Sequence, residues 1–305
     1  MESILGIAPI AWSNDDLPEL GGTTPLKTCL SEARTAGFSG IEMGGKFPTS
    51  EEHLFSALDA HNLKLASGWY SGTLLNNSIQ SEKRRIQSQL NLFKALNAPC
   101  IIYGETSDTI QNKRNVPLNH RRTLTGAELR AYSRRLDDFS KWCLDQELQL
   151  AFHHHMGTVI ETETELDILV ENSSDSLKLC FDTGHMEFAG GDPLRSVSNH
   201  SDRIAHFHCK DIRSEVVDKL DRSSDSFLDA VLKGAFTVPG DGDIDFAPIL
   251  NQLFEHRYEG WFVVEAEQDP QKAPPLEYAQ IGHKHLTDCL ANVGYQIVSS
   301  LKSYR

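Results

Sequence analysis

Histidines and carboxylates recur in this chain directly after stretches of apolar residues. Three consecutive histidines, at positions 153–155, follow one such stretch, and Asp182 and His185 follow the next. His206 and His208 alternate within a later stretch. Imidazole nitrogens and carboxylate oxygens bind divalent metals such as Mn²⁺, Co²⁺, Fe²⁺ and Zn²⁺, and the same groups transfer protons near neutral pH. These residue types therefore point to a metal site that performs acid–base chemistry.

The spacing of these groups is that of strands and not of a local metal-binding motif. Side chains two residues apart share one face of a strand, so His153 pairs with His155, and His208 pairs with Lys210. No two of the six cysteines form a CxxC pair, which argues against a cysteine zinc site and a disulfide framework. Structural alternatives exist for each group, since an aspartate after a strand can cap a helix, and Glu265 can pair with Lys210.

Eight short apolar or aromatic runs are expected to form the strands that position these groups. Most of the runs are continuous, as expected for parallel strands buried on both faces, and helical stretches separate them. The predicted strands are 5–10, 40–43, 63–69, 100–103, 148–153, 177–182, 204–210 and 261–265. The predicted helices are 23–36, 51–62, 82–96, 125–146, 161–171, one that begins at 192–193, 246–256 and 275–293.

This alternation of strands and helices fits a closed barrel or a doubly wound sheet. A doubly wound nucleotide-binding sheet has a glycine-rich turn after its first strand, and residues 9–12 (PIAW) stand there instead. Polar residues follow nearly every strand, as an active site at one face of a barrel requires. The sequence therefore predicts a single (β/α)8 barrel over residues 1–305, with an insertion near 214–234 over the active-site face and a short helix at 227–232.

The charge and the apolar pattern of the chain argue against several classes of function. The formal net charge of -14 repels phosphate backbones and anionic lipids, so neither nucleic acid nor a membrane surface is an expected partner. The chain has no apolar run of 18 residues, and its first residues lack a basic segment ahead of an apolar one. We therefore predict neither a transmembrane span nor a signal peptide, and expect a cytoplasmic protein.

Several motifs resemble the xylose isomerase-like TIM barrel superfamily, which includes sugar epimerases, hydroxypyruvate isomerase, dehydroshikimate dehydratase and endonuclease IV. The resemblance extends over essentially the whole chain. Longer stretches within it resemble the inosose dehydratases (2-keto-myo-inositol dehydratases). The superfamily motifs are FSGIE at 38–42, FDTGH at 181–185, IAHFHCKD at 204–211 and VE at 264–265. The longer stretches lie at 8–16 with 18–22, at 153–158, at 239–242 with 244–246, and at 264–270.

The resemblance implies a divalent metal ion held by Asp182, His208 and Glu265, which match the ligand positions of the superfamily. The fourth superfamily ligand is a glutamate at the end of strand five, where this chain has His153. Either His155 or a water molecule is the alternative fourth ligand. The expected ion is Mn²⁺ or Co²⁺, with Fe²⁺, Zn²⁺ and Mg²⁺ as alternatives.

The resemblance further implies an enzyme that removes water from a cyclic polyol ketone, 2-keto-myo-inositol, to give a trihydroxycyclohexane-dione in inositol catabolism. Superfamily epimerases use two carboxylates on opposite sides of the substrate, and the histidine at position 153 leaves only one, which favours a dehydratase. Lys210 is expected to have a depressed pKa beside a metal and several histidines. The candidate bases are Glu265, His155 and Glu267, and the candidate acids are His185 and Lys210. The expected substrate-binding residues are Trp12, Glu42, Trp69, Tyr103 and His206, because aromatic rings and polar groups at a barrel mouth suit a polyol ring.

Two alternatives to a dehydratase stay open on the sequence alone. A ketose epimerase or isomerase on the same barrel is the enzymatic alternative, and a non-catalytic sugar-binding protein is the alternative from another class. An endonuclease IV-like enzyme is disfavoured, because the acidic chain lacks a basic surface for DNA. The expected partner is thus a small polyol or sugar, and a homo-oligomer is expected by analogy with the superfamily.

Overall fold

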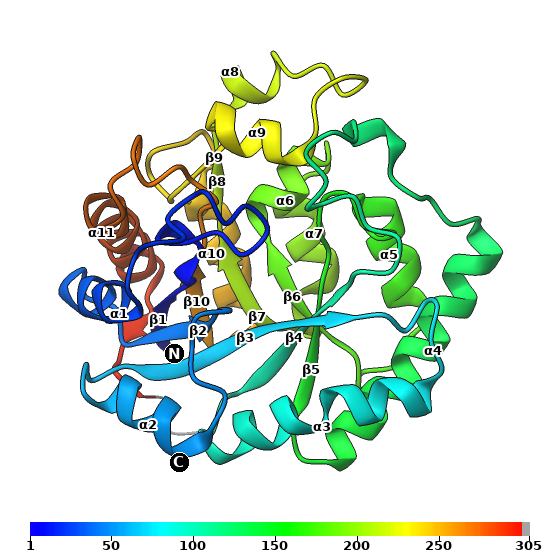
Figure 1. Ribbon diagram of the computed structural model, residues 1–305, viewed down its shortest axis with the longest axis horizontal. Helices are drawn as coiled ribbons and strands as arrows, with labels where there is room; N and C mark the ends of the chain where they lie inside the picture. Colours follow the sequence, from blue (N-terminus) through cyan, green and yellow to red (C-terminus); the bar gives the residue numbers. More distant parts are fainter. Residues whose placement is uncertain (301–305) are drawn as a thin grey trace.

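The computed structural model describes residues 1–300, which form a closed barrel of parallel strands surrounded by helices (Figure 1). The strands of the barrel are β1 (Glu2–Ile7), β2 (Gly40–Met43), β3 (Lys64–Gly72), β4 (Cys100–Glu105), β5 (Gln149–His153), β6 (Lys178–Asp182), β7 (Ile204–Cys209) and β10 (Trp261–Val264). Neighbouring strands pair in chain order, and β1 pairs with β10 to close the ring. A two-residue strand, β11 (Gln296–Ile297), adds to the outside of this ring at β1. The predicted (β/α)8 barrel is confirmed.

Each predicted helix is present, and the local sequence explains where several of them begin. The side chains of Thr125 and Thr162 each accept a hydrogen bond from the backbone N–H of a glutamate three residues on, and the side chain of that glutamate accepts one from the backbone N–H of the threonine. Pro193 and Pro275 begin their helices, where a missing N–H costs nothing. These helices are α1 (Leu26–Thr35), α2 (Glu51–Asp59), α3 (Ile79–Ala95), α4 (Gly126–Asp145), α5 (Glu163–Glu171), α7 (Pro193–His200), α10 (Phe246–Glu255) and α11 (Pro275–Val293).

The observed elements differ from the predicted ones at two places that border the site. The first strand was expected at 5–10, but β1 ends at Ile7, because Pro9 has no N–H for a strand ladder and begins a 3-10 turn, η1 (Pro9–Ala11). A helix that the sequence did not predict, α6 (Thr183–Phe188), begins directly at the end of β6. Its six residues are too few to display a helical period in the sequence.

The main core lies between the strands and the surrounding helices, whereas small groups of side chains fill the inside of the barrel. Ile4, Val263 and the ring of Trp261 form one such group, and Cys100 and Cys180 belong to another. The barrel is therefore packed and is not a pore, so a ligand site can open only at the strand ends. None of the described helices is both long and apolar enough to cross a membrane.

A long segment between β7 and β10 folds over the carboxyl ends of the strands (Figure 1). It contains the antiparallel pair β8 (Asp211–Ile212) and β9 (Phe236–Thr237), and between these strands lie α8 (Ser214–Val217) and α9 (Phe227–Lys233). Helix α9 matches the short helix predicted at 227–232. The rings of Phe227 and His155 lie 5.1 Å apart between centroids, so this segment adds an apolar wall beside the predicted site.

Asp211 anchors the loop that follows β9. Its two carboxylate oxygens accept hydrogen bonds of 2.9 to 3.2 Å from the backbone N–H groups of Ile212, Gly240, Gly242 and Ile244. A side chain at Gly242 would overlap the Asp211 carboxylate, which explains the glycine there. The motif at 239–242 therefore has a structural reason, which is to wrap backbone donors around one carboxylate.

We predict that Asp211→Ala lowers the free energy of unfolding by about 3 kcal/mol, because four backbone N–H groups lose their acceptor. The midpoint of urea denaturation followed by circular dichroism measures this change. The control is Asp218→Ala at an exposed aspartate of the same segment, which should change stability by less than about 0.5 kcal/mol. Equal midpoints for the two variants would contradict the anchoring role.

Candidate active site

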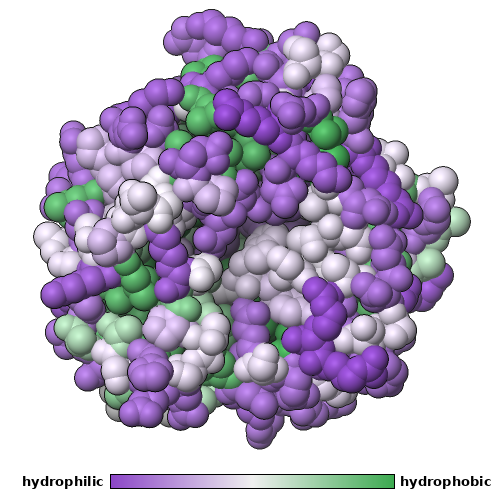
Figure 2. Space-filling view, viewed as in Figure 1, coloured by the Kyte–Doolittle hydropathy of each residue, from purple (hydrophilic) through white to green (hydrophobic). Residues whose placement is uncertain are grey.

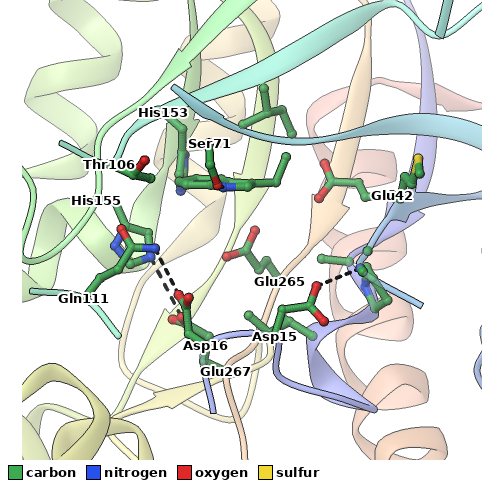
Figure 3. A pocket seen from close by; sticks show the side chains of 18 of the residues that line it. Asp15, Asp16, Glu42, Ser71, Thr106, Gln111, His153, His155, Glu265 and Glu267 are labelled. Carbon is green, nitrogen blue, oxygen red and sulfur yellow. Dashed lines mark hydrogen bonds and ion pairs between the residues drawn. The ribbon is translucent and has the colours of Figure 1, made fainter. Parts of the chain in front are cut away.

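A cavity of about 970 Å³ opens at the carboxyl ends of the strands. The face seen in Figure 2 is hollowed near its centre, and hydrophilic residues border the hollow. The side chains of Glu42, His153, His155 and Glu265 line the cavity (Figure 3), and so does that of Trp69. They come from β2 and β3, from the end of β5 and just beyond it, and from the residue after β10. This is the position at which the active sites of (β/α)8 barrels lie.

The four residues proposed as metal ligands from the sequence converge at the base of this cavity. One ligand atom each from His153, Asp182, His208 and Glu265 lies within 4.8 Å of the others, and all four side chains are buried. They come from β5, β6 and β7 and from the residue after β10, which are consecutive around the barrel. Two imidazoles and two carboxylates form a mixed nitrogen and oxygen set that suits Mn²⁺, Co²⁺, Fe²⁺ or Zn²⁺.

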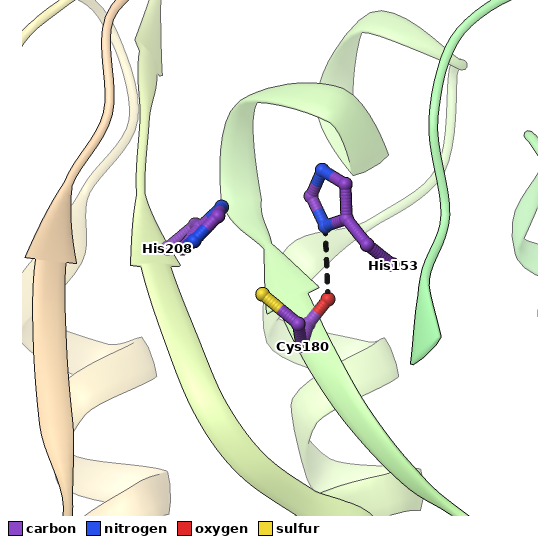
Figure 4. Close-up of side chains that lie close together, drawn as sticks. All are labelled: His153, Cys180 and His208. Atoms are coloured by element: carbon purple, nitrogen blue, oxygen red, sulfur yellow. Dashed lines mark hydrogen bonds between the residues drawn. The ribbon is translucent and has the colours of Figure 1, made fainter. Parts of the chain in front are cut away.

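The ring of His153 is held in the orientation that a ligand needs. Its Nδ1 donates a hydrogen bond of 3.1 Å to the backbone carbonyl of Cys180, as Figure 4 shows, so Nε2 carries the lone pair. Burial lowers the pKa of His153 well below its ordinary value, which keeps the ring neutral. The Cys180 thiol lies near both histidines, but burial raises its pKa to about 12, so it stays protonated.

Asp182 satisfies both interpretations of its sequence position. Its Oδ1 accepts a hydrogen bond of 2.8 Å from the backbone N–H of His185 and so caps helix α6. Its Oδ2 has no hydrogen-bond partner among the described residues and lies 3.5 Å from Nδ1 of His208. One oxygen thus begins a helix while the other remains available to a cation.

The charges at this site call for a cation. His208 Nδ1 lies 2.6 Å from Glu265 Oε2, yet this nitrogen makes no hydrogen bond of normal geometry within residues 1–300. A ring nitrogen and two carboxylate oxygens thus converge on one point, as the ligands of a metal ion do. Three buried carboxylates, of Asp182, Glu265 and Glu267, also surround a single buried ammonium group, that of Lys210, at 2.8 to 3.7 Å. A divalent cation fits this site on both geometry and charge.

Lys210 lies behind the cluster and bridges it to a second group of residues. Its three ammonium protons match three acceptors, which are Oε1 of Glu265 at 2.8 Å, Oε2 of Glu267 at 2.8 Å and Nε2 of His185 at 2.7 Å. His185 and Lys210 are fully buried and do not border the cavity, whereas His155 and Glu267 do. The pairing of Glu265 with Lys210 that the sequence suggested is therefore present.

Two residues of this second group, Lys210 and Glu267, have pKa values above their ordinary values. Burial alone would lower the pKa of Lys210, but Asp182, Glu265 and Glu267 raise it well above its ordinary value. The predicted depression of this pKa is therefore wrong for the metal-free site, because three carboxylates outweigh desolvation. Burial raises the pKa of Glu267, against the opposing charges of Lys210 and His155, so Glu267 binds a proton more readily than an exposed glutamate does.

Two aromatic residues predicted to bind substrate lie away from the cavity. Trp12 is only 1% exposed, belongs to the core between strands and helices, and donates a hydrogen bond of 2.6 Å to Glu32 of α1. The ring of Tyr103 points outward from β4 into the same core, where its hydroxyl contacts Glu105 and the backbone of Leu74. These two predictions are corrected. β1 ends before Trp12, and Tyr103 stands on the outer face of its strand.

The other three predicted substrate residues lie at or beneath the cavity. Trp69 borders it, and its ring makes edge contacts with His153 and His155. Glu42 also borders it, and its Oε1 contacts the Nε2 atoms of His206 and His208. Burial alone would raise the pKa of Glu42, but His208 and His206 lower it to about 2, so the carboxylate is ionised. His206 is fully buried inside the barrel and does not reach the cavity.

The sequence did not single out three polar residues at the rim of the cavity. Asp16 accepts a hydrogen bond of 2.9 Å from Gln111, and Asp15 accepts one of 2.8 Å from the backbone N–H of Gly45 (Figure 3). Asp15 and Asp16 lie in the stretch 8–16 that resembles the inosose dehydratases, which was the available signal. Gln111 lies in an irregular segment after β4, where no periodic pattern marks a residue as facing a site.

The fold and the site define the class of protein. The family described as xylose isomerase-like TIM barrel matches residues 30–289, and the chain belongs to this family.

The chain is also similar to individual proteins of this kind. The chain is 45% identical over 296 residues to the rhizopine catabolism protein MocC of Rhizobium meliloti, covering 97% of this chain and 91% of that protein. It is 40% identical over 286 residues to an inosose dehydratase of Clostridium tetani, covering 93% and 96%. The solved structure of the IOLI protein with a bound zinc atom superposes with a TM-score of 0.67 at 16% identity, covering 95% and 99%, which supports the fold alone.

We predict that His153 and not His155 is the strand-five ligand, because only His153 shares a cluster with Asp182, His208 and Glu265. His153→Ala should raise the dissociation constant for Mn²⁺ more than about 100-fold, and His155→Ala less than about 10-fold, since loss of a ligand exceeds loss of an outer contact. Competition with a fluorescent chelator measures both constants. A larger loss in His155→Ala would reverse the assignment.

Proposed function

We propose that this protein is a metal-dependent hydro-lyase that converts 2-keto-myo-inositol into a trihydroxycyclohexane-dione. The observation that carries the proposal is a mixed histidine and carboxylate cluster beside a separate histidine and glutamate pair that borders the same cavity. The identity of 40% to an inosose dehydratase over 93% of the chain supports this substrate. Dehydration needs one polarising cation, one base and one acid, and the two groups offer all three.

The metal would be held by His153, Asp182, His208 and Glu265, and we propose Mn²⁺ or Co²⁺ as the natural ion. When bound, the ion acts as a Lewis acid toward the ketone oxygen and acidifies the neighbouring C–H group. The remaining steps belong to side chains of the chain itself. Trp69 offers an aromatic face at the cavity wall against which the C–H face of the ring packs.

Proton transfer is best assigned to His155 and Glu267. Glu265 is a weaker candidate for the base, because its Oε1 is bound by Lys210 and its Oε2 faces His208. Nδ1 of His155 donates a hydrogen bond of 2.9 Å to the backbone carbonyl of Met156, which leaves the lone pair on Nε2. This Nε2 lies 3.9 Å from Oε1 of Glu267, so both groups face one place in the cavity.

His155 Nε2 removes the proton from the carbon next to the ketone, and Glu267 in its protonated form gives a proton to the β-hydroxyl. The carbon–hydrogen bond and the carbon–oxygen bond break, a carbon–carbon double bond forms, and one water molecule leaves. The enol that results becomes the dione by moving a proton from oxygen to carbon. His185 and Lys210 lie behind this pair, and their role is to hold Glu267 and Glu265 in place.

The cavity wall favours an uncharged substrate. Five carboxylates, of Asp15, Asp16, Glu42, Glu265 and Glu267, border it, and neither lysine nor arginine does so within the described part of the chain. A sugar phosphate would meet repulsion there, whereas a neutral polyol ketone offers hydroxyl donors to carboxylate acceptors. We also propose a cytoplasmic location, which is supported by six cysteines that are all free.

Ultraviolet absorbance tests the reaction directly. Protein stripped of metal by a chelator should leave 2-keto-myo-inositol unchanged, and Mn²⁺ or Co²⁺ added back singly should produce the rising absorbance of a conjugated enol-dione. The expected ratio of rates with and without metal is at least about 10³, since polarisation of the ketone contributes several kcal/mol. A flat trace with every metal would exclude this reaction. Exchange of substrate hydrogen with deuterated water, without loss of water, would indicate an epimerase.

A second variant tests the proton-transfer pair. Glu267→Gln should lower kcat by about 10² to 10⁴, because the amide cannot donate the proton that the leaving hydroxyl needs. Its Mn²⁺ dissociation constant should stay within about 10-fold of the original, because Glu267 lies outside the metal cluster. Glu255→Gln on the exposed side of α10 is the matched control and should keep full activity. An active Glu267→Gln variant would contradict the assignment.

A further inference from the structure

We infer that Glu42 is a positioning residue of the metal centre, whose carboxylate fixes the tautomer and orientation of His208. The sequence alone suggested substrate binding for Glu42. The inference rests on the proposed function only in taking the cluster around His208 to be a metal site.

Glu42 reaches His208 from a strand that does not pair with β7. It lies in β2, whereas His206 and His208 lie in β7, and 166 residues separate Glu42 from His208 in the chain. Its Oε1 accepts hydrogen bonds from Nε2 of His206 at 2.7 Å and from Nε2 of His208 at 2.9 Å. All three side chains are buried, so water does not compete for these hydrogen bonds.

This contact decides which nitrogen of His208 can bind a metal. The imidazole that binds a metal is neutral and has one N–H donor and one acceptor nitrogen. Because Nε2 donates to Glu42, the lone pair lies on Nδ1. Nδ1 is the atom that faces Oδ2 of Asp182 at 3.5 Å and Oε2 of Glu265 at 2.6 Å without a hydrogen-bond partner. The acceptor nitrogen therefore points to the place where the other ligands converge.

An anionic partner on the far nitrogen does more than orient the ring. It makes the near nitrogen a stronger ligand, and loss of such a partner typically weakens metal binding 10- to 100-fold. His153 has the same arrangement in a weaker form, since the acceptor of its Nδ1–H is the neutral carbonyl of Cys180. The two histidines of the cluster thus bind through different nitrogens. In each ring, the hydrogen bond that one nitrogen donates leaves the lone pair of the other nitrogen for the metal.

His206 completes the arrangement from inside the barrel. Its ring is fully buried, lies 5.5 Å from that of His208 between centroids, and donates to the same carboxylate oxygen. With two donors on Oε1, this oxygen of Glu42 is held by the two histidines of β7. We therefore assign this contact of Glu42 to the metal centre.

The test is the affinity of the full chain for Mn²⁺ in Glu42→Gln, measured by competition with a fluorescent chelator, without substrate. The amide keeps the shape but loses the charge, so the dissociation constant should rise about 10- to 100-fold. Asp15→Asn is the matched control, because it removes one negative charge from the same cavity wall without contact to His208, and it should change the constant less than about 3-fold. The visible absorption of bound Co²⁺ should change in Glu42→Gln and stay the same in Asp15→Asn.

Two further variants cover a loss of folding in Glu42→Gln, which thermal unfolding would reveal. Glu42→Asp keeps the charge but is one methylene too short, so its Mn²⁺ affinity should fall between those of the original chain and Glu42→Gln. His206→Gln keeps an N–H donor toward Oε1 of Glu42 and leaves the contact between Glu42 and His208 in place, so it should bind Mn²⁺ within about 3-fold of the original. A loss in His206→Gln as large as that in Glu42→Asp would overturn the inference and indicate a general packing role.

The outcomes separate this inference from the proposed function. If the original chain binds Mn²⁺ and Glu42→Gln binds it equally well, the role of Glu42 is overturned and the hydro-lyase stays in place. The same holds if Asp15→Asn loses as much Mn²⁺ affinity as Glu42→Gln. An original chain that binds neither Mn²⁺ nor Co²⁺ overturns both. Weaker binding and an altered Co²⁺ spectrum in Glu42→Gln alone support the inference.

Discussion

The burial of three carboxylates around one ammonium group is the constraint on which the site depends. Asp182 at the end of β6 and Glu265 and Glu267 just beyond β10 are removed from water, and all three form ion pairs with Lys210. Such an arrangement is costly unless each charge has a partner. A divalent cation in the cluster would offset negative charge that Lys210 leaves unpaired. The electrostatic balance of these buried groups therefore favours a bound cation.

Much of the fold and part of the site could be predicted from the sequence, and the remaining features could not. The eight strands were visible because parallel strands buried on both faces leave continuous apolar runs, and the capped helices between them leave start signals. The four cluster residues were visible because ligand types follow consecutive strands. Trp12 and Tyr103 were misplaced because their position depends on where one strand ends and which face another strand presents. Asp15, Asp16 and Gln111 were missed because loops carry no period.

The barrel separates the groups that hold a metal from those that move protons. The metal cluster draws on β5, β6 and β7, whereas His155 and Glu267 lie two residues farther along the chain than His153 and Glu265. His155, Lys210 and Glu267 lie beyond the last residues of β5, β7 and β10, so the same offset of two residues recurs at three strand ends. Lys210 joins the two groups through Glu265 and Glu267.

Asp182 carries two constraints on a single side chain. One of its oxygens begins helix α6, and the other faces the cation site. Asparagine at this position would keep the cap but lose the charge, and glutamate would keep the charge but has one methylene too many to cap its own helix. Related proteins are therefore expected to show few other residues at this position, because a replacement would weaken either the cap of helix α6 or the binding of a cation.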